Sequence, residues 1–125
     1  MSRKILTFGY DACHRWTVMR FAGFTIHECE SIRDLRQQLM LSMSVDAVIM
    51  VEDIVSLPPE AIVAAKSYFQ GPLVLFEGRY PDANQDCFDL RIPNLTDPSD
   101  WLLRIQTIID RFASCPPAEH FEEFI

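Results

Sequence analysis

The most constraining feature of the chain is a run of five consecutive apolar residues, Ala47 to Val51, which directly follows Asp46. A strand that is apolar without alternation is typical of the centre of a parallel sheet, where helices cover both faces. Segments with helical spacing lie on either side of the run, because Ile32, Leu35 and Leu39 precede it and residues 62–69 repeat the pattern. The sequence therefore predicts an α/β domain with Ala47 to Val51 as its central strand.

Four further β-type runs alternate with helical patterns. The β-type runs cover residues 3–8, 24–29, 73–76 and 88–92, and the helical patterns follow Asp11, Ser31, Pro58 and Asp97. Strands that alternate with helices favour right-handed crossovers and an open, mostly parallel sheet. We predict a flavodoxin-like (CheY-like) three-layer α/β fold with a five-stranded parallel sheet in the order 2-1-3-4-5.

Local signals mark the ends of these helices. Asp11 is placed to cap the first helix, Gly23 is suited to end it, and Ser31 to Asp34 resembles a capping box. Between the fourth and fifth strands, residues 78–86 are rich in Gly, Pro, Asp and Asn, which indicates a loop. We therefore predict that the helix between these two strands, the fourth helix of this fold, is shortened or missing.

Composition limits the classes of partner. The 125 residues fit one domain, expected at 1–115, with an acidic and aromatic C-terminal tail at 116–125. A net charge of −7 without a basic face disfavours nucleic acid and anionic lipid as partners. No long apolar stretch predicts a membrane span or a secretion signal, so the cytoplasm is the expected compartment. The four widely spaced cysteines indicate free thiols and no disulfide framework.

Several stretches resemble the receiver domain of two-component response regulators. They are Ile5-Leu6 in the first strand, Met19 to Ile26 with its Ala-Gly-aromatic turn, Asp46 to Met50, and more loosely 72–76 and 90–93. The Ala-Gly-aromatic turn is the most specific of them. The likeness covers most of residues 3–112 and implies a signalling function.

The resemblance also implies where the receiver chemistry would lie. Receivers phosphorylate themselves with a carboxylate nucleophile beside a Mg²⁺ held by acidic residues. In this chain, the acidic pair falls on Gly9 and Tyr10, and the phosphate acceptor falls on Val51. The hydroxyl residue falls on Glu77, and the lysine falls on Ile92. None of these side chains can perform its role, and we predict a degenerate pseudo-receiver that is not an enzyme.

A register shifted by one residue gives an alternative. Glu52 would then occupy the acceptor position, and Asp11 with Asp53 would form a residual acidic site able to hold a metal in distorted geometry, as in an atypical response regulator. In the simpler interpretation, Asp11 caps a helix, and Glu52 and Asp53 are solvated loop charges.

Thiol chemistry gives a second alternative, a small flavodoxin-like thiol enzyme or ligand binder. Cys13 follows the first strand near a helix N-terminus, with His14 beside it, and Glu52 and Glu77 would share its sheet edge. Such a function requires a pocket with converging polar groups.

A metal site is the other chemistry that the sequence raises. His27 and Cys29 share one face of a strand and would need Cys13 or His14 to complete a site. Because a second close ligand pair is missing, we expect no metal and no cofactor.

The expected partner is another signalling protein or a second copy of the chain in a homodimer. The predicted core stripe of the last helix consists of Leu102, Ile105, Ile109 and Phe112. Trp101, Arg104 and Ile108 lie off this stripe and form a candidate docking face. In the tail, Phe121 and Phe124 among acidic residues are typical of a short partner-binding segment.

Overall fold

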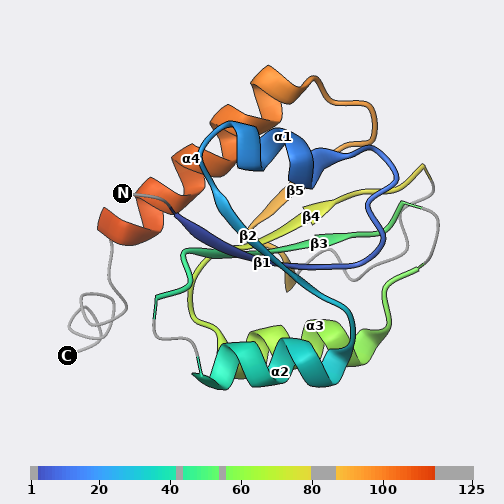
Figure 1. Cartoon of the computed structure of the whole chain (residues 1–125), viewed down its shortest axis with the longest axis vertical. Coiled ribbons are helices and arrows are strands. Elements are labelled where there is room, and N and C mark those ends of the chain that lie inside the picture. The colour runs from blue at the N-terminus through green and yellow to red at the C-terminus, as the bar shows by residue number, and fades with distance from the viewer. Residues whose placement is uncertain (1–2, 42–43, 54–55, 80–86, 115–125) are drawn as a thin grey trace.

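The strands form one parallel sheet in the predicted order, β2-β1-β3-β4-β5 (Figure 1). The structure is a computed structural model and describes residues 3–41, 44–53, 56–79 and 87–114. The strands are β1 (Lys4–Phe8), β2 (Thr25–Cys29), β3 (Ala47–Val51), β4 (Leu73–Phe76) and β5 (Leu90–Ile92). β3 pairs with β1 on one side and β4 on the other, which makes it the central strand. The predicted fold class is confirmed.

In the described part of the chain, four helices cover the two faces of the sheet. They are α1 (Arg15–Phe21), α2 (Ile32–Leu41), α3 (Pro59–Tyr68) and α4 (Pro98–Ser114). Figure 1 shows α1 and α4 on one face, and α2 with α3 on the other. All neighbouring strands pair in parallel, so the carboxyl ends of the five strands meet at one edge. None of the described helices combines the length and apolar character needed to cross a membrane.

Two apolar clusters lie on the two faces of β3. Ala47, Ile49 and Val51 pack on the side of α1 and α4, while Val48 and Met50 pack on the side of α2 and α3. All five side chains of β3 are buried, because successive residues of a strand point to opposite faces and both faces are covered. Each large apolar side chain buried in this way contributes about 1.5–3 kcal/mol.

The predicted signals at the end of α1 and the start of α2 are found in the structure. Gly23 has a φ of 102° and follows α1, where Phe24 N donates to Met19 O at 3.0 Å and Gly23 N donates to Arg20 O at 3.1 Å. This pattern is a Schellman motif. At α2, Asp34 N donates to Ser31 Oγ at 3.0 Å, and Glu30 N donates to the Asp34 carboxylate at 3.3 Å, as in a capping box.

The connection from β4 to β5 contains no α-helix among its described residues, 77–79 and 87–89. Residues 80–86 lie outside the described part of the chain, as do residues 115–125 with the predicted binding positions Phe121 and Phe124.

Candidate functional site

A buried arginine lies at the carboxyl edge of the sheet, between the loops that follow β1 and β3. Arg15 Nη1 is 2.6 Å from Asp53 Oδ2 and 3.2 Å from Asp11 Oδ1. The side chains of Arg15, Asp11 and Asp53 are only 6%, 5% and 7% exposed. The guanidinium also lies over the ring of Phe76, 4.6 Å from its centroid, and the face of an aromatic ring attracts a cation. One positive charge therefore serves two carboxylates in a largely water-free setting.

Backbone amides complete the surroundings of the two carboxylates. Asp11 accepts hydrogen bonds from Cys13 N at 3.3 Å and Trp16 N at 3.1 Å, and Asp53 accepts one from Ala12 N at 3.0 Å. The N-cap of α1 is His14 and not Asp11, although the Asp11 carboxylate, from the loop before the helix, accepts from the Trp16 amide in the first turn. The loop after β1 is thus folded around the acidic groups.

This arrangement corrects one sequence-based interpretation. Glu52 and Asp53 are not solvated loop charges, because Glu52 is buried and the Asp53 side chain is covered by its contacts with Arg15 and Ala12. The role of Arg15 was missed. The available signal was its spacing of four residues from Asp11, although Asp11 lies in the loop before α1 and the fold of that loop brings the two side chains together.

Two of the predicted degenerate positions, Val51 at the end of β3 and Gly9 after β1, lie close together. Val51 is fully buried in the cluster beneath α1 and α4. Gly9 has a φ of 109°, and a Cβ atom there would lie 2.3 Å from the carbonyl oxygen of Val51. The adjacent Tyr10 is exposed. Position 9 therefore has no room for a side chain of any kind, acidic ones included.

The two remaining degenerate positions lie on the β4 and β5 side of the edge. The Glu77 carboxylate accepts from Arg91 Nη1 at 3.4 Å, while Ile92 is fully buried in the apolar cluster. Glu52 Oε1 lies 3.5 Å from Gly78 N, within hydrogen-bonding distance. A Cβ on Gly78 would lie 2.0 Å from the Glu52 carbonyl oxygen, so the chain segments approach each other closely here as well.

Cys13 and His14 are exposed at the start of α1. A cavity of about 470 Å³ lies at the carboxyl ends of β1 and β2, next to the loop that contains Gly9 and Tyr10. Its lining is made by residues 7–10, 28–30 and 56–58. Cys13, His14, Glu52 and Glu77 do not line this cavity, so it does not supply the pocket that the thiol alternative needs.

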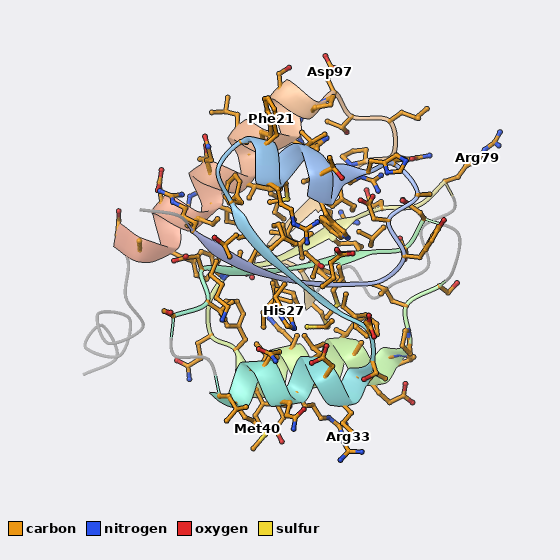
Figure 2. All side chains as sticks on the ribbon, in the orientation of Figure 1. Phe21, His27, Arg33, Met40, Arg79 and Asp97 are labelled. Atoms are coloured by element: carbon orange, nitrogen blue, oxygen red, sulfur yellow. The ribbon has the colours of Figure 1, made fainter. Side chains whose placement is uncertain are left out.

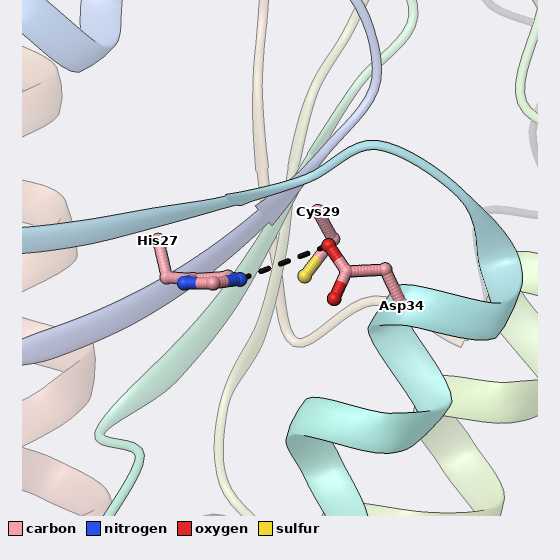
Figure 3. A group of neighbouring side chains, drawn as sticks. All are labelled: His27, Cys29 and Asp34. Atoms are coloured by element: carbon pink, nitrogen blue, oxygen red, sulfur yellow. Dashed lines mark ion pairs between the residues drawn. The ribbon is translucent and has the colours of Figure 1, made fainter.

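His27 and Cys29 lie at the other side of the sheet with a third residue, Asp34 (Figure 3). The nitrogen, sulfur and oxygen atoms that could bind a metal all lie within 4.8 Å of one another. Burial, and secondarily the charge of Asp34, raises the pKa of the Cys29 thiol from 9.0 to about 12. The expected additional ligands, Cys13 and His14, are not part of this group, and Asp34 was recognised in the sequence only as a capping residue.

The predicted docking face on α4 is wrong for two of its three residues. Trp101 and Ile108 are 3% and 7% exposed and belong to the core. Trp101 packs edge-on against Phe76, with ring centroids 5.1 Å apart. The apolar stripe of α4 is centred on Trp101, Ile105, Ile108 and Ile109, whereas the predicted stripe members Leu102 and Phe112 are only partly buried. Arg104 is exposed and pairs with Asp100 at 3.2 Å.

No protein-family model matches the chain, and no curated protein matches it in sequence. Several solved structures resemble it. A response regulator receiver domain protein from Clostridium thermocellum has a TM-score of 0.71 at 15% identity, covering 91% of this chain and 99% of that one. The N-terminal domain of a response regulator/sensory box/GGDEF three-domain protein from Carboxydothermus hydrogenoformans has a TM-score of 0.70 at 10% identity, covering 90% and 98%.

A third similar structure is the receiver domain of a sensor histidine kinase from Pseudomonas aeruginosa PAO1, solved with a magnesium ion coordinated in its active site cleft. Its TM-score is 0.68 at 11% identity, and the match covers 88% of this chain and 99% of that one. At these identities the likeness concerns the fold. The chain has the fold of a response regulator receiver domain.

Proposed function

We propose that this domain is a receiver-like signalling module that binds another signalling protein, or a second copy of itself, without accepting a phosphoryl group on an aspartate. The observation that carries the proposal is the Arg15 guanidinium, held between the carboxylates of Asp11 and Asp53. The receiver fold of the structural neighbours supports a place in two-component signalling. In this proposal the domain is a binding module and not an enzyme.

The first support is electrostatic. A Mg²⁺ ion at this edge would need oxygen ligands, and Asp11 and Asp53 are the acidic residues gathered there. Their carboxylates already share the guanidinium and three backbone amides. Removing one partner from a buried ion pair costs about 3–5 kcal/mol, because the other charge is left uncompensated. Arg15 thus acts as a built-in cation and opposes the metal on which phosphorylation depends.

The second support concerns the nucleophile and its surroundings. Val51 has no atom that can attack phosphorus, and its side chain is enclosed in the core. Glu52, the acceptor in the shifted register, is also buried, which denies a phosphoryl donor an open approach. Ile92 supplies no charge to balance a phosphoryl group. These features favour the pseudo-receiver over the residual acidic site.

A receiver-like domain without phosphorylation chemistry would act by binding a partner protein with its outer surface. Helix residues that lie outside the core include large apolar side chains, among them Phe21 at the end of α1, which is 96% exposed, and Leu103 on α4. Figure 2 shows Phe21 projecting from the layer formed by α1 and α4. Arg104 on the same layer is also exposed. We propose the outer face of this layer as the contact surface for the partner. Of the three residues of the candidate docking face, this surface includes Arg104 but not the buried Trp101 and Ile108.

An amide NMR titration tests the absence of phosphorylation chemistry. Addition of Mg²⁺ and then of beryllofluoride, a mimic of the aspartyl phosphate, should leave the amide shifts of Asp11, Val51, Glu52 and Ile92 unchanged, because Arg15 occupies the acidic site. A functional receiver domain titrated in parallel serves as the positive control. Saturable shifts at Asp11 and Glu52 would instead support the alternative acidic site and overturn the proposal.

Removal of the built-in cation should open the acidic site to metal. In the Arg15→Met variant, Mg²⁺ should produce saturable shifts at Asp11 and Asp53 that the unmodified protein lacks. Arg20→Met removes a cation from an exposed pair with Glu28 and is the matched control, for which no such gain is expected. If Arg15→Met stays insensitive to Mg²⁺, the carboxylates of Asp11 and Asp53 are not a masked metal site.

A further inference from the structure

The corner between β2 and α2 brings together three different metal-binding groups. His27 and Cys29 are two residues apart on β2, so their side chains lie on the same face of the strand. Asp34 lies in the first turn of α2, and its Oδ2 is 3.7 Å from His27 Nε2. Figure 3 shows the imidazole and the thiol both directed toward the Asp34 carboxylate. The group is separate from the one formed by Asp11, Arg15 and Asp53.

The imidazole nitrogen at the centre of this group lacks a hydrogen bond. His27 Nε2 is a buried atom without a hydrogen-bond partner, although 41% of the side chain is exposed. The 3.7 Å separation from Asp34 is too long for a hydrogen bond. Leaving a buried polar atom unsatisfied is unfavourable, because the atom has lost its hydrogen bonds to water. A metal ion placed between the nitrogen, the sulfur and the carboxylate would satisfy it.

The donor set and its charge fit a zinc-like ion. Imidazole nitrogen, thiolate sulfur and carboxylate oxygen are the three ligand types that Zn²⁺ accepts, at about 2.0–2.3 Å. In a tetrahedral site with bonds of that length, neighbouring ligand atoms lie about 3.3–3.8 Å apart. The His27 to Asp34 separation of 3.7 Å falls in this range, and all three atoms already lie within 4.8 Å. One thiolate and one carboxylate would neutralise the charge of a divalent ion.

The surroundings orient the ligands and leave a path for the metal. Asp34 is fixed by hydrogen bonds involving Ser31 Oγ and Glu30 N, and such outer contacts position the ligands of metal sites. β2 is an edge strand, and the partial exposure of His27 gives an ion access from solvent.

We propose that His27 Nε2, Cys29 Sγ and the Asp34 carboxylate form a binding site for one divalent transition-metal ion of the zinc class, with a water molecule as fourth ligand. The site is separate from the group formed by Asp11, Arg15 and Asp53, and it does not depend on the proposed signalling function. A sequence-based expectation of no metal rested on a missing second ligand pair, and Asp34 supplies the ligand that the pattern did not reveal.

Titration of the intact, reduced chain with Co²⁺ tests this site. We expect saturation at one equivalent, with the near-ultraviolet absorption of a thiolate bound to cobalt, the visible bands of a tetrahedral ion, and displacement by Zn²⁺. His27→Gln, Cys29→Ser and Asp34→Asn should each weaken binding at least about 100-fold, since even loss of an outer contact costs about 10- to 100-fold. Cys13→Ser is the matched control, because Cys13 is exposed outside the group, and its titration should be unchanged.

Two results would overturn the proposal. One is the absence of thiolate-to-cobalt absorption in the unmodified chain at a large excess of Co²⁺. The other is an absorption that survives His27→Gln and Cys29→Ser but disappears in Cys13→Ser. Circular dichroism establishes that each variant is folded. If Cys29→Ser fails to fold, His27→Gln decides the outcome, because its partly exposed side chain can be replaced without opening the core.

Discussion

Replacement of Arg15 by methionine should lower the free energy of unfolding by about 3–5 kcal/mol, measured by urea denaturation at neutral pH. The variant keeps much of the side-chain volume but leaves the carboxylates of Asp11 and Asp53 nearly buried without their shared cation. It also removes the contact of the guanidinium with the Phe76 ring. This loss would be a large fraction of the stability of a domain of this size.

Arg20→Met is the control for this effect. Arg20 pairs with Glu28 at 3.1 Å, but the two side chains are 47% and 53% exposed. A solvent-exposed pair of this kind contributes about 0–1 kcal/mol. Substituting Asp11→Asn and Asp53→Asn in the Arg15→Met background should recover part of the lost stability, because it removes the uncompensated charge. A loss below about 1 kcal/mol for Arg15→Met itself would contradict the role assigned to the arginine.

The second large effect is expected for Gly9→Ala, which should destabilise the fold by at least about 3 kcal/mol. An alanine at this position would adopt a φ of 109° and place its Cβ 2.3 Å from the carbonyl oxygen of Val51. The positive φ strains the alanine backbone, and the clash of its Cβ with Val51 forces β1 and β3 apart at the edge of the sheet. Thermal unfolding monitored by circular dichroism would measure the change.

Gly23→Ala separates these two contributions. Gly23 has a similar φ of 102°, but nothing lies within 4 Å of the position of an added Cβ. Its substitution should cost only the backbone strain, about 1–2 kcal/mol. If both variants lose the same stability, the close approach to Val51 is not a constraint on position 9. The same crowding predicts that Gly9→Asp will not restore an acidic site.

The fold was predictable from local patterns, whereas the site depended on contacts across the chain. Ala47 to Val51 identified the central strand, because an unbroken apolar run requires cover on both faces. Gly23 and Ser31 identified helix ends through their local chemistry. These features need only neighbouring residues, and the structure confirms them.

The ion-pair site could not be derived in the same way. Asp53 follows β3 and Arg15 opens α1, and only the pairing of β1 with β3 brings their loops together. A charged residue in a loop is expected to be exposed to solvent. This expectation was wrong for Asp53, whose side chain is nearly buried against Arg15. The prediction that Trp101 is exposed was wrong for a different reason. The apolar stripe of α4 also includes Trp101 and Ile108, so it is wider than the stripe predicted from the sequence.

The close approach of Gly9 and Gly78 to the backbone around Val51 and Glu52 bears on how such a domain would convey information. Under the proposed function, return to a phosphorylatable state requires simultaneous changes of nucleophile, metal ligands and local backbone spacing, and single steps toward it are each costly. Single substitutions would therefore not restore phosphorylation to this domain. Its output would be set by how many copies are present and by what occupies its surface, so a cell would regulate this module through expression and competition for its partner.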